Sequence, residues 1–234
     1  MSLFAISDLH LPCDDSKKMD VFGDNWKDHF DQIKDNWYKV VKPDDIVLLP
    51  GDLSWAMSLD DALPHLKMIS DLPGRKVILR GNHDYWWTSL TKVRNAVTNG
   101  TYVIQNDSIC LGDYVICGTR GWSMPGDPSF DEDKDRQIYD RELIRLQLTL
   151  DSAGKELKEG RKLIVMMHFP PAYPNGKDTG FTKLISDSGA SAVVYGHLHG
   201  KQYNIDMYPV LLLSDIPYYL VSCDTNDFKL KKLY

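Results

Sequence analysis

The sequence predicts an α/β or α+β fold in which helices and sheets are stacked in layers. In the first half of the chain, short apolar segments alternate with longer segments of helical periodicity, a pattern typical of parallel strands joined by helices. In the second half, pairs of short apolar segments around turn residues indicate antiparallel hairpins. Polar motifs follow several of the predicted strands, and ligands in such folds bind at the carboxyl ends of strands.

Hydrophobic spacing places the elements of the first half. Continuous apolar segments bounded by polar residues predict buried strands, and apolar residues three and four positions apart predict helices. The expected elements are strands at 3–7, 46–49 and 77–79 and helices at 25–41, 59–69 and 88–97. Pro64 opposes the second helix, because proline cannot donate the backbone hydrogen bond that a helix interior requires.

The second half begins with a hairpin predicted around Gly112-Asp113. Two loops rich in glycine and proline follow, at residues 119–134 and 170–180, and apolar residues at helical spacing predict a helix at 139–157 between them. Further strands are expected at 163–167, 192–195, 203–207, 210–213, 219–222 and 228–230. We expect the last four of these strands to form antiparallel hairpins.

The composition favours a single globular domain over residues 1–234. Of the 234 residues, 43% are hydrophobic, which suffices for a packed core, and the motifs described below span most of the chain. The formal net charge of −6 argues against extended nucleic-acid binding and against binding to an anionic membrane.

The cysteines and the amino-terminal segment bear on the cellular compartment. Cys13, Cys110, Cys117 and Cys223 lack the C-x-x-C spacing of metal or redox sites, so we expect reduced thiols. The chain starts with an expected strand rather than a signal peptide, and no apolar segment approaches the ~20 residues of a membrane helix. These features predict a soluble protein of the cytoplasm.

Five of the seven histidines lie in short motifs that span the chain. The motifs are Asp8-Leu9-His10, Gly51-Asp52, Gly81-Asn82-His83-Asp84, the single His168 and Gly196-His197-Leu198-His199. Asp-x-His and Gly-Asp are weak signals alone, whereas each histidine-containing tetrapeptide is expected by chance in fewer than roughly one chain in a hundred. Side chains of Asp, His and Asn supply oxygen and nitrogen ligands, and together at one sheet edge they would form a two-metal site.

This order of motifs resembles that of the calcineurin-like metallophosphoesterases, the binuclear metallophosphatase superfamily. The resemblance covers residues 8–199 and implies a four-layered αββα sandwich with two central mixed sheets and a metal site at the carboxyl ends of strands. It implies that Asp8, His10 and His199 hold one ion, that Asn82, His168 and His197 hold the second, and that Asp52 bridges both. It further implies that His83 contacts the substrate and that Asp84 orients the ring of His83.

Elementary electrostatics agrees with these roles. Two divalent ions ~3.5–4 Å apart repel strongly, so a carboxylate such as Asp52 is needed between them. Such ions would lower the pKa of a bridging water and give a hydroxide for in-line attack on a phosphate ester, while His83 and Asp84 supply a proton to the leaving group. Oxygen and nitrogen ligands without thiolates suit Mn²⁺, which we favour, and also iron or Zn²⁺.

Residues outside the motifs leave alternatives open. His29 and His65 lie in predicted helices and are expected to be ordinary surface residues. Four tryptophans near the motifs could stack a base or sugar, but packing is the preferred interpretation: Trp55, Trp86, Trp87 and Trp122. Four arginines could bind a second phosphate: Arg80, Arg120, Arg136 and Arg141. Arg120 is the best candidate of these, whereas Arg136 and Arg141 are better explained as solvated helix charges.

The sequence thus predicts a metal-dependent phosphoesterase that acts on a phosphate mono- or diester. A small phosphorylated metabolite or nucleotide is the preferred substrate class, and the loops at 119–134 and 170–180 are expected to select it. A protein phosphatase or nuclease of the same superfamily is an alternative. Another is a protein-interaction scaffold that has lost the metals but kept the fold. The sequence does not indicate an oligomeric state.

Overall fold

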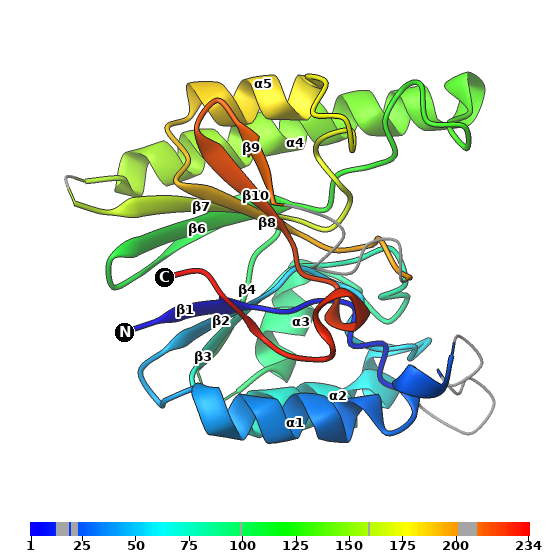
Figure 1. Cartoon of the computed structure of the whole chain (residues 1–234), viewed down its shortest axis with the longest axis vertical. Helices are drawn as coiled ribbons and strands as arrows, with labels where there is room; N and C mark the ends of the chain where they lie inside the picture. Colours follow the sequence, from blue (N-terminus) through cyan, green and yellow to red (C-terminus); the bar gives the residue numbers. More distant parts are fainter. Residues whose placement is uncertain (13–18, 20–22, 99, 159, 201–209) are drawn as a thin grey trace.

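Two β-sheets lie face to face between two groups of helices (Figure 1). The computed structural model describes residues 1–12, 19, 23–98, 100–158, 160–200 and 210–234. Helices α1, α2 and α3 cover the outer face of one sheet, and α4 and α5 cover the outer face of the other (Figure 1). The four layers confirm the predicted αββα sandwich.

The first sheet has the strand order β11-β1-β2-β3-β4. Its strands are β1 (Leu3–Ala5), β2 (Ile46–Leu49), β3 (Arg75–Ile78), β4 (Thr101–Val103) and β11 (Lys231–Lys232). The covering helices are α1 (His29–Val40), α2 (Leu59–Asp71) and α3 (Leu90–Ala96), with a short 3₁₀ helix, η3 (Asp24–Trp26), before α1. Strands β1 to β4 are parallel, and β11 joins β1 in the antiparallel direction, which makes the sheet mixed.

The second sheet has the order β5-β6-β7-β8-β10-β9. Its strands are β5 (Asp107–Leu111), β6 (Tyr114–Thr119), β7 (Lys162–Met167), β8 (Ala192–Tyr195), β9 (Leu211–Leu213) and β10 (Ile216–Leu220). Helices α4 (Glu132–Glu156) and α5 (Gly180–Asp187) cover it, and a second 3₁₀ helix, η5 (Cys223–Asn226), follows β10. The four central strands are parallel and both edge strands are antiparallel.

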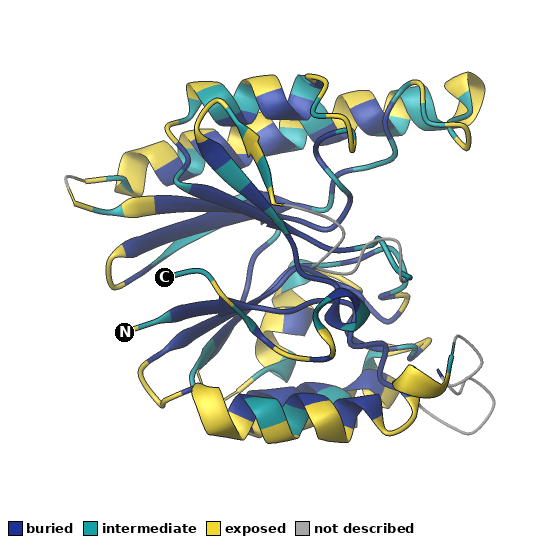
Figure 2. Cartoon of the chain, viewed as in Figure 1, coloured by how far each residue is buried: buried dark blue, intermediate teal, exposed yellow. Residues whose placement is uncertain are grey.

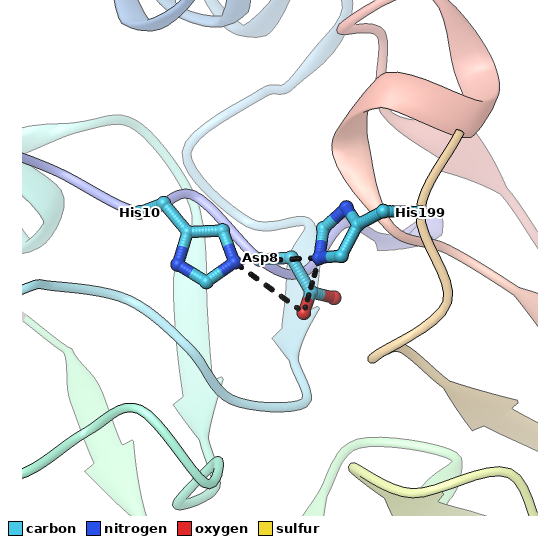
Figure 3. Close-up of side chains that lie close together, drawn as sticks. All are labelled: Asp8, His10 and His199. Carbon is cyan, nitrogen blue, oxygen red and sulfur yellow. Dashed lines mark hydrogen bonds and ion pairs between the residues drawn. The ribbon is translucent and has the colours of Figure 1, made fainter. Parts of the chain in front are cut away.

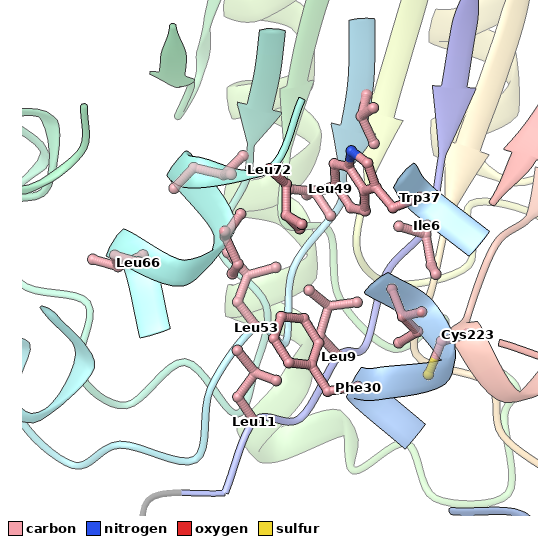
Figure 4. Close-up of a cluster of buried hydrophobic side chains, with 14 of the residues drawn as sticks. Ile6, Leu9, Leu11, Phe30, Trp37, Leu49, Leu53, Leu66, Leu72 and Cys223 are labelled. Atoms are coloured by element: carbon pink, nitrogen blue, oxygen red, sulfur yellow. The ribbon is translucent and has the colours of Figure 1, made fainter. Parts of the chain in front are cut away.

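Three apolar clusters fill the spaces between the four layers. Side chains alternate along a strand, so Leu3 and Ala5 of β1 face the second sheet while Phe4 and Ile6 face the helices. Figure 4 shows part of the cluster between the first sheet and its helices, where Trp37 of α1 lies near strand residues such as Leu49. The central strands are buried on both faces, as continuous apolar segments require (Figure 2).

Most predicted elements are confirmed, with differences that have physical reasons. Helix α4 starts at Glu132, seven residues before the expected start, because its exposed first turn is acidic and carries no apolar periodicity. Helix α5 was not predicted, and α2 continues through Pro64. The segment 228–230 is not a strand. Strand β10 forms the expected antiparallel hairpin with β9, but on its other side it pairs with β8 in parallel. The expected strand at 203–207 lies outside the described residues.

Two observations concern the predicted compartment. Among the described residues, no helix has the length and apolar character needed to cross a membrane. Cys110, Cys117 and Cys223 are free thiols, and Cys13 lies outside the described residues.

Candidate metal centre

The predicted metal ligands converge at the carboxyl ends of strands from both sheets. Asp8 and His10 follow β1, Asp52 follows β2, Asn82 follows β3, His168 follows β7, and His197 and His199 follow β8. Parallel strands end at the same edge of a sheet, so these residues from distant parts of the sequence meet between the two sheets. The contacts between them define two adjoining groups.

The first group consists of Asp8, His10 and His199 (Figure 3). The Nε2 atoms of the two histidines are 3.3 Å apart. Oδ1 of Asp8 lies 3.4 Å from Nε2 of His199 and 3.9 Å from Nε2 of His10. One carboxylate oxygen and two imidazole nitrogens therefore face one point, as the ligands of a metal ion must.

The second group contains Asn82, His168 and His197, with Asp52 beside them. Oδ1 of Asn82 lies 2.6 Å from Nε2 of His168 and 2.9 Å from Nδ1 of His197. Oδ2 of Asp52 lies 3.4 Å from Nε2 of His168 and 3.9 Å from Nε2 of His10. Because this one oxygen faces a histidine of each group, Asp52 occupies the position between the two groups.

The backbone is unusual at the same residues. Asp8, His10, Asp52 and His197 have φ angles of 59°, 45°, 55° and 72°. Left-handed backbone costs a residue with a Cβ on the order of 1–3 kcal/mol and persists when the surrounding structure enforces it, most often at functional sites. Four of the seven predicted ligands therefore have a backbone conformation that the fold maintains at a cost in stability.

The glycine before each of three ligands permits close packing at these strand ends. Gly51 has a φ of 100°, and a Cβ on it would lie 2.6 Å from the Cα of Gly81. A Cβ on Gly81 would meet the carboxylate of Asp52, and a Cβ on Gly196 would meet that of Asp8. Glycine is required at position 51 by the positive φ angle and at positions 81 and 196 by the close approach of a carboxylate.

Second partners fix the orientation of several ligand side chains. Nδ1 of His168 lies 2.9 Å from the carbonyl oxygen of Pro50, and Nδ1 of His199 lies 2.9 Å from Oδ1 of Asp224. Each contact uses one ring nitrogen and leaves Nε2 to face the site, which is the usual arrangement around metal-bound histidines. Asp224 was not predicted from the sequence, because it forms no motif, although it follows strand β10.

Asp8 is held in a similar way. Its Oδ2 accepts hydrogen bonds from the hydroxyl of Ser7, from the hydroxyl of Ser222 at 3.0 Å and from the backbone N–H of His197 at 3.1 Å. The N–H of His197 also donates to Oδ1 at 3.2 Å, and Oδ1 faces the two histidines of the first group. The buried carboxylate is thus fixed before any ligand binds.

The electrostatics of the site reflects buried charge of both signs. Burial alone would raise the pKa of Asp8, but the hydrogen bond and charge of His199 and the charge of His168 lower it below its usual range. Burial disfavours the charged form of His168, yet the charge and hydrogen bond of Asp52 raise its pKa to about 9. Burial is again opposed by carboxylates at His199, where Asp224 and Asp8 raise the pKa to about 10. The carboxylates thus favour a positive charge on His168 and His199, whereas burial lowers the pKa of His10 and of His197 to about 4.

His83 and Asp84 differ in their surroundings from what the sequence predicted. The carboxylate of Asp84 accepts backbone hydrogen bonds from Asp52 at 2.9 Å, Leu53 at 2.8 Å and Gly81 at 2.8 Å. The neighbour of the His83 ring is Tyr85, whose hydroxyl oxygen lies 3.1 Å from Nδ1 of His83. The expectation that Asp84 orients the His83 ring is therefore corrected: Asp84 holds together the loops that carry the ligands.

A cavity of about 430 Å³ opens onto the two groups. The ring of His83 lines it, together with Asp52 and histidines of both groups. Its apolar side comes from Met19, Trp26 and Trp55, and Trp55 stacks on His10 with a centroid distance of 4.8 Å. Trp55 therefore contacts the site, and Trp26, which the sequence placed in a helix, lies there as well.

Other residues outside the motifs are placed as follows. Trp86 and Trp87 are buried in the core, as the preferred interpretation predicted. His29 is also buried, with ring nitrogens close to the carbonyls of Trp26 and Leu9, so its expected surface position was wrong. His65 is half-buried, and its Nδ1 lies 2.7 Å from the hydroxyl of Ser54.

Comparison with known proteins identifies the family. The family model described as calcineurin-like phosphoesterase matches residues 1–201. The chain belongs to this family. Family membership assigns the chain to the hydrolases that act on ester bonds and implies a divalent metal centre, for which carboxylate and imidazole groups of the site are candidate ligands.

Three similar proteins share limited sequence identity or coverage with this chain. The Gene 66 protein of Mycobacterium phage L5 is 36% identical over 78 residues, an alignment that covers 33% of this chain and 37% of the phage protein. Phosphopantetheinyl hydrolase (PptH) from Mycobacterium tuberculosis superposes over 99% of this chain and 95% of its own, with 14% identity and a TM-score of 0.57. A protein of unknown function from Aquifex aeolicus, AQ665, superposes over 99% of this chain and 95% of its own, with 17% identity and a TM-score of 0.53. These structural likenesses show the shared fold.

Proposed function

We propose that this chain hydrolyses phosphate mono- or diesters at a centre of two divalent ions. Asp8, His10 and His199 would hold one ion, Asn82, His168 and His197 the other, and Asp52 would bridge them. The position of Asp52 carries the proposal, because its Oδ2 faces His10 on one side and His168 on the other at 3.9 and 3.4 Å. The carboxylate and imidazole donors suit Mn²⁺, which we favour, or iron or Zn²⁺.

The chain's own residues would position and protonate the substrate. When bound, the two ions would polarise the phosphoryl oxygens and lower the pKa of a water towards neutrality, which provides the attacking hydroxide. His83 lines the cavity with its ring and would donate a proton to the leaving oxygen. Its Nδ1 neighbour is the Tyr85 hydroxyl, so Tyr85 rather than Asp84 would orient the ring. Asp84 would act by positioning Asp52.

The cavity favours a small substrate. Its volume of about 430 Å³ lies in the range of small-molecule sites, and Trp26 and Trp55 offer ring faces beside the histidines. A phosphorylated metabolite or a nucleotide, with an apolar or planar part next to the phosphate, fits such a lining. The net charge of −6 argues against a long nucleic acid as substrate. A cytoplasmic location remains a prediction from the sequence.

Activity on simple phosphate esters tests the proposal. Purified protein loaded with Mn²⁺ should hydrolyse p-nitrophenyl phosphate or its bis ester, and chelation of the metal should abolish turnover. Asp52→Asn should lose activity and bound metal, whereas the control Asp133→Asn, at an exposed carboxylate of α4, should keep both. Absence of hydrolysis by protein that contains two ions per chain, with any divalent metal, would refute the proposed activity. The scaffold alternative instead predicts sub-stoichiometric metal.

A further inference from the structure

A second cavity, of about 240 Å³, is lined by four arginines. Arg80 follows β3, Arg120 follows β6, and Arg141 and Arg145 lie one turn apart on α4. Arginines from three segments that are distant in sequence thus line one cavity. Arg80, Arg120 and Arg145 are half-buried, and Arg141 is exposed. Like charges that are brought together in this way repel each other and destabilise the fold unless an anion lies among them.

One carboxylate faces these arginines, and its hydrogen-bonding capacity is used by other groups. Glu142 is fully buried, and its Oε1 accepts a hydrogen bond from Arg145 at 2.5 Å. Its Oε2 accepts from the hydroxyl of Thr119 at 2.6 Å and from the backbone N–H of Gly121 at 3.1 Å. Glu142 therefore pairs directly with Arg145, and its single negative charge leaves a net positive charge among the four arginines of the cavity.

The remaining guanidinium groups have free donors. Within the described part of the chain, the guanidinium groups of Arg80, Arg120 and Arg141 form no hydrogen bond or ion pair, and Nε of Arg80 is buried without a partner. Arg120 lies over the ring of Trp122 at 4.7 Å, a contact that leaves the edge of its guanidinium available for hydrogen bonds. Burial lowers the pKa of Arg120, Glu142 opposes this, and Arg80, Arg145 and Arg141 lower it further.

We propose that this cavity is an oxyanion site that binds a phosphate group, separate from the metal centre. Arginine binds phosphate through paired N–H donors, and several such groups around one cavity can surround a dianion. A volume of about 240 Å³ admits a phosphate, since it is several times the ~30 Å³ that a water molecule occupies in the liquid. A bound phosphate would also remove the repulsion among the arginines.

The cavity is linked to the metal centre through the backbone. Arg80 is two residues before Asn82, and the carbonyl of Arg120 accepts hydrogen bonds from the backbone N–H groups of His168 at 3.1 Å and Phe169 at 2.9 Å. The phosphate can come from two sources: the far phosphate of a substrate whose ester lies at the metals, or a separate phosphate ligand. The first source rests on the proposed function, whereas the binding site itself does not.

Thermal unfolding of the full chain in inorganic phosphate tests the site without any activity measurement. Phosphate, compared with chloride at equal ionic strength, should raise the Tm saturably both in Mn²⁺-loaded protein and after chelation. In the double variant Arg80→Gln, Arg120→Gln, the affinity for phosphate after chelation should fall tenfold or more, because each lost charge-assisted hydrogen bond is worth about a decade. The control Arg136→Gln changes an α4 arginine that pairs with Glu132, and it should respond like the wild type.

The double variant also distinguishes a binding site from a structural role. Without phosphate, loss of two repelling charges should leave the Tm unchanged or higher, whereas arginines needed for structure would give a lower Tm. The site is refuted if chelated wild-type protein shows no saturable phosphate effect, or if the double variant retains the full effect.

Kinetics on Mn²⁺-loaded enzyme identifies the source of the phosphate. If the cavity binds the far phosphate of a substrate, a sugar bisphosphate should have a lower KM than the matching monophosphate, and the double variant should remove this difference. The KM for p-nitrophenyl phosphate should not change. If a separate phosphate ligand binds, the two sugar phosphates should have equal KM values in both proteins while the effect on Tm persists.

Discussion

Replacement of Gly51 by alanine tests whether close backbone packing sets the metal site. The new Cβ would lie 2.6 Å from the Cα and N of Gly81 and 2.8 Å from Nδ1 of His168, whereas ordinary contact begins at 3.4 Å. The neighbouring strand ends must therefore separate by about 0.8 Å. Productive geometry at a site tolerates displacements of ~0.5 Å, so Asp52, which follows Gly51, should move from its position between the two groups of predicted ligands.

The expected effect of Gly51→Ala exceeds the cost of a left-handed backbone alone. Backbone with a φ of 100° costs an alanine on the order of 1–3 kcal/mol, and overpacking adds about 1–3 kcal/mol. Gly189→Ala is the matched control, because Gly189 also has a positive φ, of 72°, but a Cβ there meets nothing within 4 Å. We expect Gly51→Ala to lower Mn²⁺ affinity tenfold or more and turnover about 100-fold, whereas Gly189→Ala should lose stability alone.

The assay combines calorimetric titration of chelator-treated protein with Mn²⁺, urea denaturation and turnover of p-nitrophenyl phosphate. The denaturation curve establishes that each variant folds, so that a loss of metal affinity is not mistaken for unfolding. Wild-type metal affinity and turnover in folded Gly51→Ala would refute the conclusion that this close contact positions the ligands. Equal losses of affinity in both variants would show that backbone strain, and not crowding, is responsible.

Further predictions concern residues around the site and in the core. Asp224→Asn should weaken Mn²⁺ binding about 10–100-fold in a metal titration, because Asp224 orients His199. Metal binding should release protons, and the affinity should increase as the pH rises toward about 9. The reason is that His168 and His199, with pKa values raised to about 9 and 10, must lose protons before they bind an ion. Calorimetric titration at several pH values measures both effects. His83→Ala should reduce turnover about 10²–10⁴-fold while metal analysis shows unchanged content. Lys76→Met should destabilise the fold by roughly 2–4 kcal/mol in urea, because the buried ammonium donates to three backbone carbonyls at 2.6–2.8 Å.

The sequence indicated the strands better than the helices that begin in loops. Strand β2, at 46–49, and strand β8, at 192–195, were predicted with the observed bounds, because a short apolar segment between polar residues has few other interpretations. Helix α5 follows a loop rich in proline and glycine, and its start depends on the capping residue Thr179 and its contact with Thr182. Apolar periodicity over eight residues is too short to reveal such a helix.

In the site as well, residues in local sequence motifs were predictable, whereas roles that depend on contacts between distant segments were not. The predicted metal ligands could be found because each stands in a motif, and the fold brings them together. Asp224 could not be found, since its role depends on the contact with His199, 25 positions away in sequence. The role of Asp84 was predicted wrongly because its partners at 52 and 53 lie in another loop, while its neighbour His83 faces the cavity.

The arginine cavity was predictable in part from the sequence. Arg80 and Arg120 were named as candidate phosphate ligands, and Arg120 was preferred because it lies in a predicted loop near the site. Arg141 was explained as a solvated helix charge, and the structure leaves it exposed at the edge of the cavity. The spacing of Arg141 and Arg145 places both on one face of α4, a signal that the sequence offered. That this face meets the ends of β3 and β6 became visible in the structure alone.

The number of ions bound per chain tests the central claim most directly. Chelator-treated protein, equilibrated with Mn²⁺ and freed of unbound metal, should contain two manganese ions per chain by elemental analysis, because Asp52 lies between the two groups of predicted ligands. A content below one ion per chain, from protein shown to be folded, would contradict the two-metal centre.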